Sequence, residues 1–204
     1  RYAAEPFFFS YASDKESPQL FAKINHYFVI VCCILLLAVG TNLDILKVIF
    51  LRDSEYWVGL PIVPILLLAY LFQGVYYNMT VWFKLTDKTH YATIITIFGA
   101  IVTIVANYVL IPIAGYMGSS WASLICYFST TALCYILGQK FYPIPYNIAK
   151  GLSYIVVTTL LVYAVNAVLI DDELIAASFH ALVLLAYVAV GYLIEKKDLR
   201  ALTN

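Results

Sequence analysis

The sequence predicts an all-α fold: a polytopic membrane helix bundle of about six transmembrane helices. Three observations lead to this prediction. The chain is 63% hydrophobic and 12% charged, whereas about 25% of the residues in an average soluble domain are charged. Residues 89–139 form a run of 51 residues without Asp, Glu, Lys or Arg. Finally, Lys and Arg are distributed unevenly over the loops that separate the apolar segments.

The uncharged run 89–139 is long enough for two membrane-crossing helices and a tight turn. A helix that crosses about 30 Å of hydrocarbon needs ~20 residues. We expect Pro112 to end the first helix, and Gly115 and Gly118 to permit the reversal of the chain. Small or polar residues recur along each helix at spacings of mostly three and four, which favours close packing of the two helices. The two stripes are Thr93, Thr96, Ala100, Thr103 and Asn107, and Ser119, Ser123, Cys126, Thr130 and Cys134.

Four other apolar segments are long enough to cross a membrane, and polar or aromatic residues bound each of them. They lie at 24–50, 56–83, 151–170 and 174–194. Ser17 and Pro18 precede the first of these as a favourable helix start. The predicted organisation is an upstream helix end with a cytoplasmic loop (1–23), four transmembrane helices (24–138), a cytoplasmic loop (139–149), two additional transmembrane helices (150–194) and a tail (195–204).

The distribution of basic residues supports this number of spans. If the loops alternate between the two sides, ten of the twelve Lys and Arg residues fall on one side, and only Lys47 and Arg52 fall on the other. Because basic loops stay in the cytoplasm, both ends of the chain are predicted to be cytoplasmic. The chain starts at Arg1 rather than Met and soon enters an apolar stretch. We therefore expect it to be a piece of a longer protein.

Motifs that carry enzyme chemistry are absent from the sequence. There is no zinc-protease, nucleophile-elbow, P-loop or dinucleotide-binding pattern. His26, His90 and His180 are far apart, and the four cysteines, all within apolar segments, are expected to be small packing residues. We therefore predict no enzymatic activity, no catalytic residue, no metal site and no cofactor. Net charge is zero, so nothing indicates a nucleic-acid partner.

Five polar or charged residues within the predicted spans are candidates for a substrate pathway: Gln73, Asn78, Asn107, Asp44 and Lys47. Polar groups inside spans either line a hydrophilic cavity or bond a neighbouring helix, and the second case is the commoner one. Asp44 and Lys47, three residues apart on one helix, are expected to pair near an interface. The basic loops would attract anionic membrane lipids.

Several short patterns together resemble those of a known transporter family. They are Glu5-Pro6-Phe-Phe-Phe9, Tyr56-Trp57-x-Gly59-Leu60-x-x-Val63-Pro64, Lys84-Leu-Thr-Asp-Lys88 and Asn107-x-x-x-Ile111-Pro112-x-x-Gly115-x-x-Gly118. The chain resembles the polysaccharide flippases of the multidrug/oligosaccharidyl-lipid/polysaccharide exporter superfamily, in particular the lipopolysaccharide and O-antigen repeat-unit translocases. The resemblance covers most of residues 1–147.

This resemblance implies a fold and a cargo. The chain would be the C-terminal portion of a transporter of 12–14 helices, in which 24–138 complete the second lobe and 150–194 supply two extra helices. The implied function is to flip undecaprenyl-diphosphate-linked oligosaccharides across the bacterial inner membrane by alternating access, together with the N-terminal half. Basic residues that meet the diphosphate are expected in that other half, because the predicted spans here carry no Lys or Arg at mid-membrane depth.

Two other functional classes stay open from the sequence alone. One is a polytopic membrane acyl- or glycosyl-transferase of cell-envelope synthesis, whose catalytic residues would lie upstream. The other is a non-catalytic membrane scaffold. A second six-span repeat upstream would favour the transporter, whereas a large polar loop with clustered His, Asp or Arg would favour the enzyme.

Overall fold

The structure, a computed structural model, describes residues 17–51, 53–168, 170 and 172–203. The side chains of these residues are described too, except at 173 and beyond 196. All its regular elements are helical: α2 (Ser17–Thr41), α3 (Leu43–Phe50), η1 (Ser54–Ile62), α4 (Val63–Met79), α5 (Val81–Leu85), α6 (His90–Ala114), α7 (Tyr116–Phe141), α8 (Ile148–Asn166) and α9 (Glu173–Thr203). The upstream helix end predicted within 1–23 lies outside the described residues.

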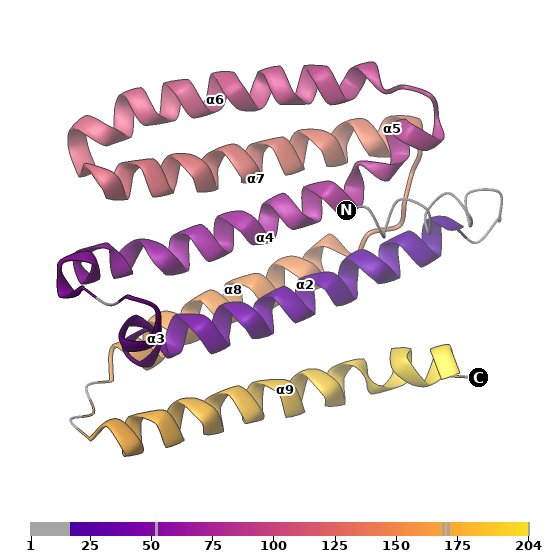
Figure 1. The fold of residues 1–204 in the computed structure, drawn as a ribbon. Helices are drawn as coiled ribbons and strands as arrows, with labels where there is room; N and C mark the ends of the chain where they lie inside the picture. Colours follow the sequence, from indigo (N-terminus) through magenta and orange to yellow (C-terminus); the bar gives the residue numbers. More distant parts are fainter. Residues whose placement is uncertain (1–16, 52, 169, 171, 204) are drawn as a thin grey trace.

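The described helices include six segments that are long and apolar enough to cross a membrane, so the chain is a polytopic membrane protein. The helices lie roughly side by side (Figure 1). The antiparallel pair α6–α7 forms one side of the bundle, and α4 packs against α7. The pair α2–α8 follows, and α9 lies beyond it on the far side. The all-α membrane bundle predicted from the sequence is confirmed.

The first predicted span, 24–50, is wrong in its bounds. Helix α2 starts at Ser17, as the Ser-Pro start signal indicated, and ends at Thr41, while α3 forms a separate short helix. Two side chains account for the break. The hydroxyl of Thr41 donates to the carbonyl of Leu37 at 2.8 Å, and the amide of Asn42 donates to the carbonyl of Ala38 at 2.8 Å. Such bonds compete with the backbone hydrogen bonds that would continue the helix.

The second predicted span, 56–83, is interrupted in two places. It starts with the 3₁₀ segment η1, which contains Pro61, and continues as α4 with Pro64 in its first turn. A second interruption at Thr80 separates α4 from α5. Trp82, in the short helix that follows this interruption, is 1% exposed. It stacks on Phe141, because the nearby glycine Gly138 leaves room for the indole ring.

The helical hairpin at 89–139 forms as predicted, but its turn differs. Pro112 lies inside α6, which continues to Ala114, so the expectation that Pro112 ends the helix is wrong. Gly115 makes the reversal instead, with a backbone φ of 56° that only glycine adopts readily. Proline lacks only the one N–H that would bond the carbonyl four residues earlier, and helical bonding resumes after it, since the N–H of Gly115 donates to the carbonyl of Ile111 at 2.8 Å.

The packing stripe predicted on α6 is also wrong. Thr93, Thr96 and Ala100 are exposed, and the residues buried against α7 are Ile95 and Gly99. Of the stripe that the sequence indicated on α7, Cys126, Thr130 and Cys134 are buried, whereas Ser119 is exposed. Among them, Cys126 donates its thiol to the carbonyl of Gly99 at 3.4 Å. The buried positions on α6 lie one residue before the predicted ones, because Gly99, without a side chain, allows the closest approach of the two backbones.

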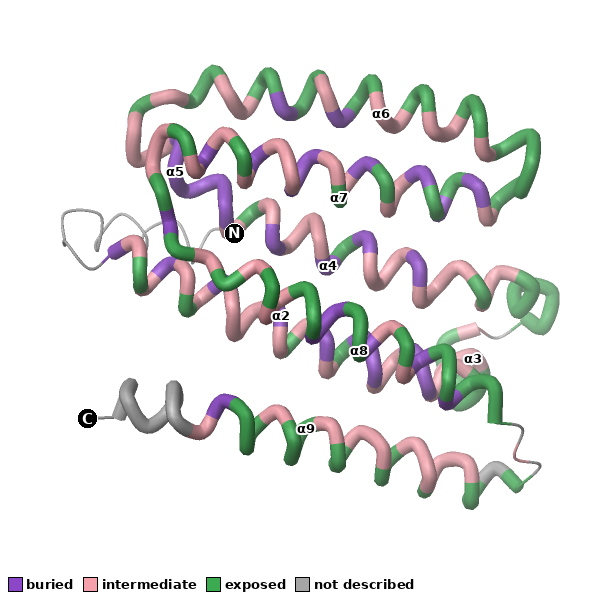
Figure 2. Tube along the Cα trace, turned by 180° about the vertical axis from the view of Figure 1, so that it is seen from behind, coloured by how far each residue is buried: buried purple, intermediate pink, exposed green. Residues whose placement is uncertain are grey.

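Helix α9 extends well past its predicted end. The tail assigned to 195–204 continues the helix to Thr203. None of the residues in the most apolar part of α9 is buried. Figure 2 shows this helix as exposed or intermediate along nearly its whole described length, with one buried position close to its C-terminal end. That buried position is Glu195, which is 3% exposed.

Candidate functional site

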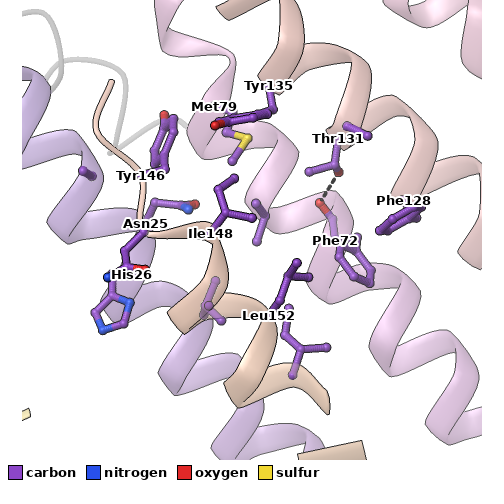
Figure 3. Close-up of a pocket in the computed structure, with 17 residues that line it drawn as sticks. Asn25, His26, Phe72, Met79, Phe128, Thr131, Tyr135, Tyr146, Ile148 and Leu152 are labelled. Atoms are coloured by element: carbon purple, nitrogen blue, oxygen red, sulfur yellow. Dashed lines mark hydrogen bonds between the residues drawn. The ribbon is translucent and has the colours of Figure 1, made fainter. Parts of the chain in front are cut away.

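The inner part of the candidate site is an apolar pocket of about 210 Å³ that α2, α4, α7 and α8 enclose. Helix α4 turns Phe72, Val75 and Met79 toward it, at the spacing of one helix face. Leu152 and Ile155 close the pocket from α8. Figure 3 shows these walls converging from helices that are far apart in sequence. The pocket can therefore hold an apolar group of a ligand.

Two polar side chains interrupt this apolar lining. Asn25 on α2 is 8% exposed, and its amide points into the pocket (Figure 3). Neither its Oδ1 atom nor the buried hydroxyl of Tyr146 has a hydrogen-bond partner among the residues that the structure describes. Burial raises the pKa of Tyr146, which lies in the loop before α8, so its hydroxyl stays protonated. An unsatisfied buried acceptor is costly, and a ligand that donates a hydrogen bond would remove that cost.

A third polar side chain in the wall is fully used within the protein. Thr131 on α7 donates its hydroxyl to the backbone carbonyl of Phe72 on α4 at 2.9 Å (Figure 3). This bond ties the two helices together behind the pocket. It sets the separation of α4 and α7 rather than offering a group to a ligand.

The pocket adjoins a polar mouth of about 250 Å³ at one end of the bundle. Ala22, His26 and Asn147 line both spaces, and Lys23 and Lys150 line the mouth only. Lys150 sits in the first turn of α8, where the side chain of Asn147 caps the helix by accepting from its backbone N–H at 3.1 Å. The apolar pocket and the cationic mouth together suit an amphipathic molecule with an anionic end.

The buried carboxylate of Glu195 contacts two residues that line the mouth, Lys150 and His26. Glu195 on α9 accepts from Lys150 Nζ at 2.9 Å through Oε2, and from the Tyr154 hydroxyl at 2.8 Å through Oε1. His26 Nε2 lies 3.1 Å from Oε1. Three groups from α2 and α8 thus meet a carboxylate of α9. Such pairing compensates for removing a charged carboxylate from water.

The residues singled out from the sequence as pathway candidates do not line this pocket. Gln73 is half-buried on α4 and is not among the residues that line the pocket. Asn78 is half-buried, and its Nδ2 atom has no hydrogen-bond partner among the described residues. Asn107 donates to the carbonyl of Thr103, one turn earlier on its own helix, at 2.8 Å.

Asp44 and Lys47 form the ion pair that their spacing predicted. They lie on α3, at the end of the bundle opposite the mouth (Figure 1). The ammonium group of Lys47 also lies 4.8 Å from the centre of the Trp57 ring. This contact is typical of a cation held at an interface next to an aromatic side chain. The pair takes no part in the pocket.

Sequence reasoning missed the residues that form the site: Asn25, His26, Tyr146, Lys150 and Glu195. One signal was available. His26, Lys150 and Glu195 each lie within a few residues of a predicted span end, and the alternation of loops places all three ends on the same side of the bundle. Within the described part of the chain, no three His, Cys, Asp or Glu side chains gather as a metal site requires.

Fold and site together define a polytopic α-helical membrane protein with an amphipathic pocket that opens at one end of the bundle. The chain matches no protein-family model, no curated protein and no solved structure.

Proposed function

We propose that the chain is part of a transporter that flips lipid-linked oligosaccharides across the bacterial inner membrane by alternating access. One observation carries the proposal: an apolar pocket within the bundle adjoins a mouth lined by Lys23, His26 and Lys150. An undecaprenyl-diphosphate cargo has the matching chemistry, because a diphosphate attracts ammonium groups and a polyprenyl chain prefers an apolar cavity.

The distribution of charge supports an orientation for this transporter. Lys84, Lys88 and Lys140 belong to the same end of the bundle as the mouth, whereas Lys47 belongs to the other (Figure 1). Under the positive-inside rule the mouth faces the cytoplasm. That is the side on which the lipid-linked repeat unit would be loaded, and both ends of this chain then lie in the cytoplasm.

The test fills the pocket without disturbing the fold. Gly151 lines the pocket, and a side chain added there would meet no atom within 4 Å of its Cβ. Gly151→Phe should therefore lower surface polysaccharide at least several-fold while the membrane abundance of the full-length protein stays normal. Gly59→Phe is the matched control, because a Cβ at Gly59 in η1 also meets open space but lies outside the pocket.

The outcome separates the proposal from its alternatives. Loss of surface glycan for Gly151→Phe, with both variants equally abundant, supports a cargo path through the pocket. Normal glycan at normal abundance would contradict it. Equal loss for both glycine variants would also contradict it, since the effect would then not depend on the pocket.

A further inference from the structure

Helix α9 is attached to the bundle mainly through long side chains. An apolar groove of about 430 Å³ separates α8 from α9. Two polar contacts bridge these helices: Glu195 to Lys150 and Tyr154, and the hydroxyl of Tyr187 to that of Thr158 at 2.7 Å. The Glu195 contacts are the only place on the described part of α9 where a side chain is buried. Docking of α9 at this end therefore depends on one carboxylate.

The partners of that carboxylate are also the groups that face the mouth. Lys150 and His26 line the mouth, and both contact Glu195. The titratable groups around the mouth are Lys23, His26 and Tyr27 on α2 and Lys150 on α8. An anionic head group that enters the mouth would therefore meet the ammonium group of Lys150, which already donates to Glu195. This ammonium group cannot direct all of its hydrogen bonds at both partners.

We propose that Glu195 is an internal competitor of the cargo head group, so that binding of the head group at Lys150 and His26 releases the C-terminal part of α9 from the bundle. The inference rests on the proposed function, because it takes a lipid-linked diphosphate as the ligand. A diphosphate carries more negative charge than a carboxylate and attracts Lys150 more strongly. Once Lys150 turns to the ligand, Glu195 is a buried carboxylate without its ion-pair partner, a state that is strongly unfavourable.

The coupling works in both directions. If the head group weakens docking of α9, then docking of α9 weakens binding of the head group by the same factor. The transporter then has two arrangements, one with α9 docked and one with α9 released. Binding of the head group in the mouth favours the released arrangement. The apolar groove beside α8 changes shape with that motion, because α9 forms one of its walls.

Binding measurements on the full-length protein in lipid nanodiscs test the competition. The probes are undecaprenyl diphosphate, undecaprenol and inorganic diphosphate, which separate the contributions of head group and chain. Glu195→Gln should lower the Kd for undecaprenyl diphosphate about tenfold, or about 1.4 kcal/mol, and leave that for undecaprenol unchanged. Lys150→Gln should raise the Kd for the diphosphate lipid. Lys140→Gln is the matched control, since that lysine lies over the Phe141 ring rather than at the mouth.

The second arm follows the position of α9 directly, both without ligand and after addition of the lipid. Spin labels at Ser153→Cys and Gly191→Cys, both beside the groove, report the separation of α8 and α9. Both are placed in a background without the native cysteines. Glu195→Gln should reduce the dipolar broadening of the spectrum, and undecaprenyl diphosphate should do the same in the protein with Glu195. If Glu195→Gln lowers the yield of folded protein, Tyr154→Phe weakens the same contact and should shift the spectrum in the same direction.

The outcomes distinguish this inference from the proposed function. Tight binding of undecaprenyl diphosphate with no effect of Glu195→Gln or Tyr154→Phe on Kd would overturn the competition and leave the transporter proposal intact. Unchanged broadening on adding the lipid would overturn the release of α9. Equal affinity for inorganic diphosphate would overturn the lipid as the ligand. Absence of binding by every probe, with normal glycan for Gly151→Phe, would contradict the proposed function itself.

Discussion

Gly118 on α7 lies so close to the backbone of Leu110 on α6 that a Cβ added to the glycine would be 2.2 Å from the Leu110 carbonyl oxygen. Real Cβ atoms do not approach a carbonyl oxygen so closely, and a backbone atom cannot move aside without moving its helix. The contact joins α6 and α7 directly beside the turn at Gly115. Close packing of the hairpin near Gly118, which the sequence predicted, is thereby confirmed.

We predict that Gly118→Leu destabilises the hairpin more than Leu133→Ala does. The first change forces the two backbones apart and should cost about 3 kcal/mol or more. The second removes a half-buried side chain that packs on the core and should cost about 2 kcal/mol. Folded yield after detergent extraction measures both. Equal yields would show that the α6–α7 contact tolerates a side chain at this position.

The orientation of the bundle can be tested with single cysteines in a background without the four native ones. Cysteines at Thr86 and Pro145 lie at the end of the mouth and should be protected from an impermeant thiol reagent applied outside intact cells. Cysteines at Ser54 and Asp172, both exposed at the opposite end, should react. Labelling of the first pair in intact cells would show that the orientation predicted from the charge distribution is wrong.

Asn25→Leu should separate binding from stability. The Oδ1 atom of Asn25 is buried without a hydrogen-bond partner among the described residues, so an apolar side chain of similar size removes an unfavourable group. We expect membrane abundance and thermal stability to be unchanged or raised by about 1 kcal/mol, while surface polysaccharide falls. A loss of abundance would mean that the amide is needed for folding instead.

Gln73→Leu should give the opposite pattern. Gln73 is half-buried on α4, outside the pocket, so we expect its amide to bond the neighbouring helix α7 and its loss to weaken the contact between the two helices. Bonds of this kind in membrane bundles contribute about 0.6 kcal/mol on average. We expect abundance and surface glycan to fall together and slightly, as quantified on the same cells. Reduced glycan at full abundance would instead place Gln73 in the cargo path.

The sequence by itself determined the class of protein and the number of spans. Long apolar runs without charged residues are stable in the hydrocarbon of a membrane, and the alternation of Lys-rich and Lys-poor loops follows from the orientation of the spans. Both signals are properties of local composition and can be read without the tertiary structure. Gly115 was predictable at the turn for a similar reason, because its backbone φ of 56° is one that depends on the residue type itself.

The tertiary structure decided where the polar groups meet. Glu195 was assigned to a tail, because nothing near it in sequence distinguishes it from a solvated residue at the end of a span. Its three partners come from α2 and α8, separated from it by 41 to 169 positions. Likewise, the side of α4 that faces the pocket depends on the rotation of that helix against α7. Composition fixes which residues enter the membrane, whereas the packing of one helix on another determines which of them contact each other.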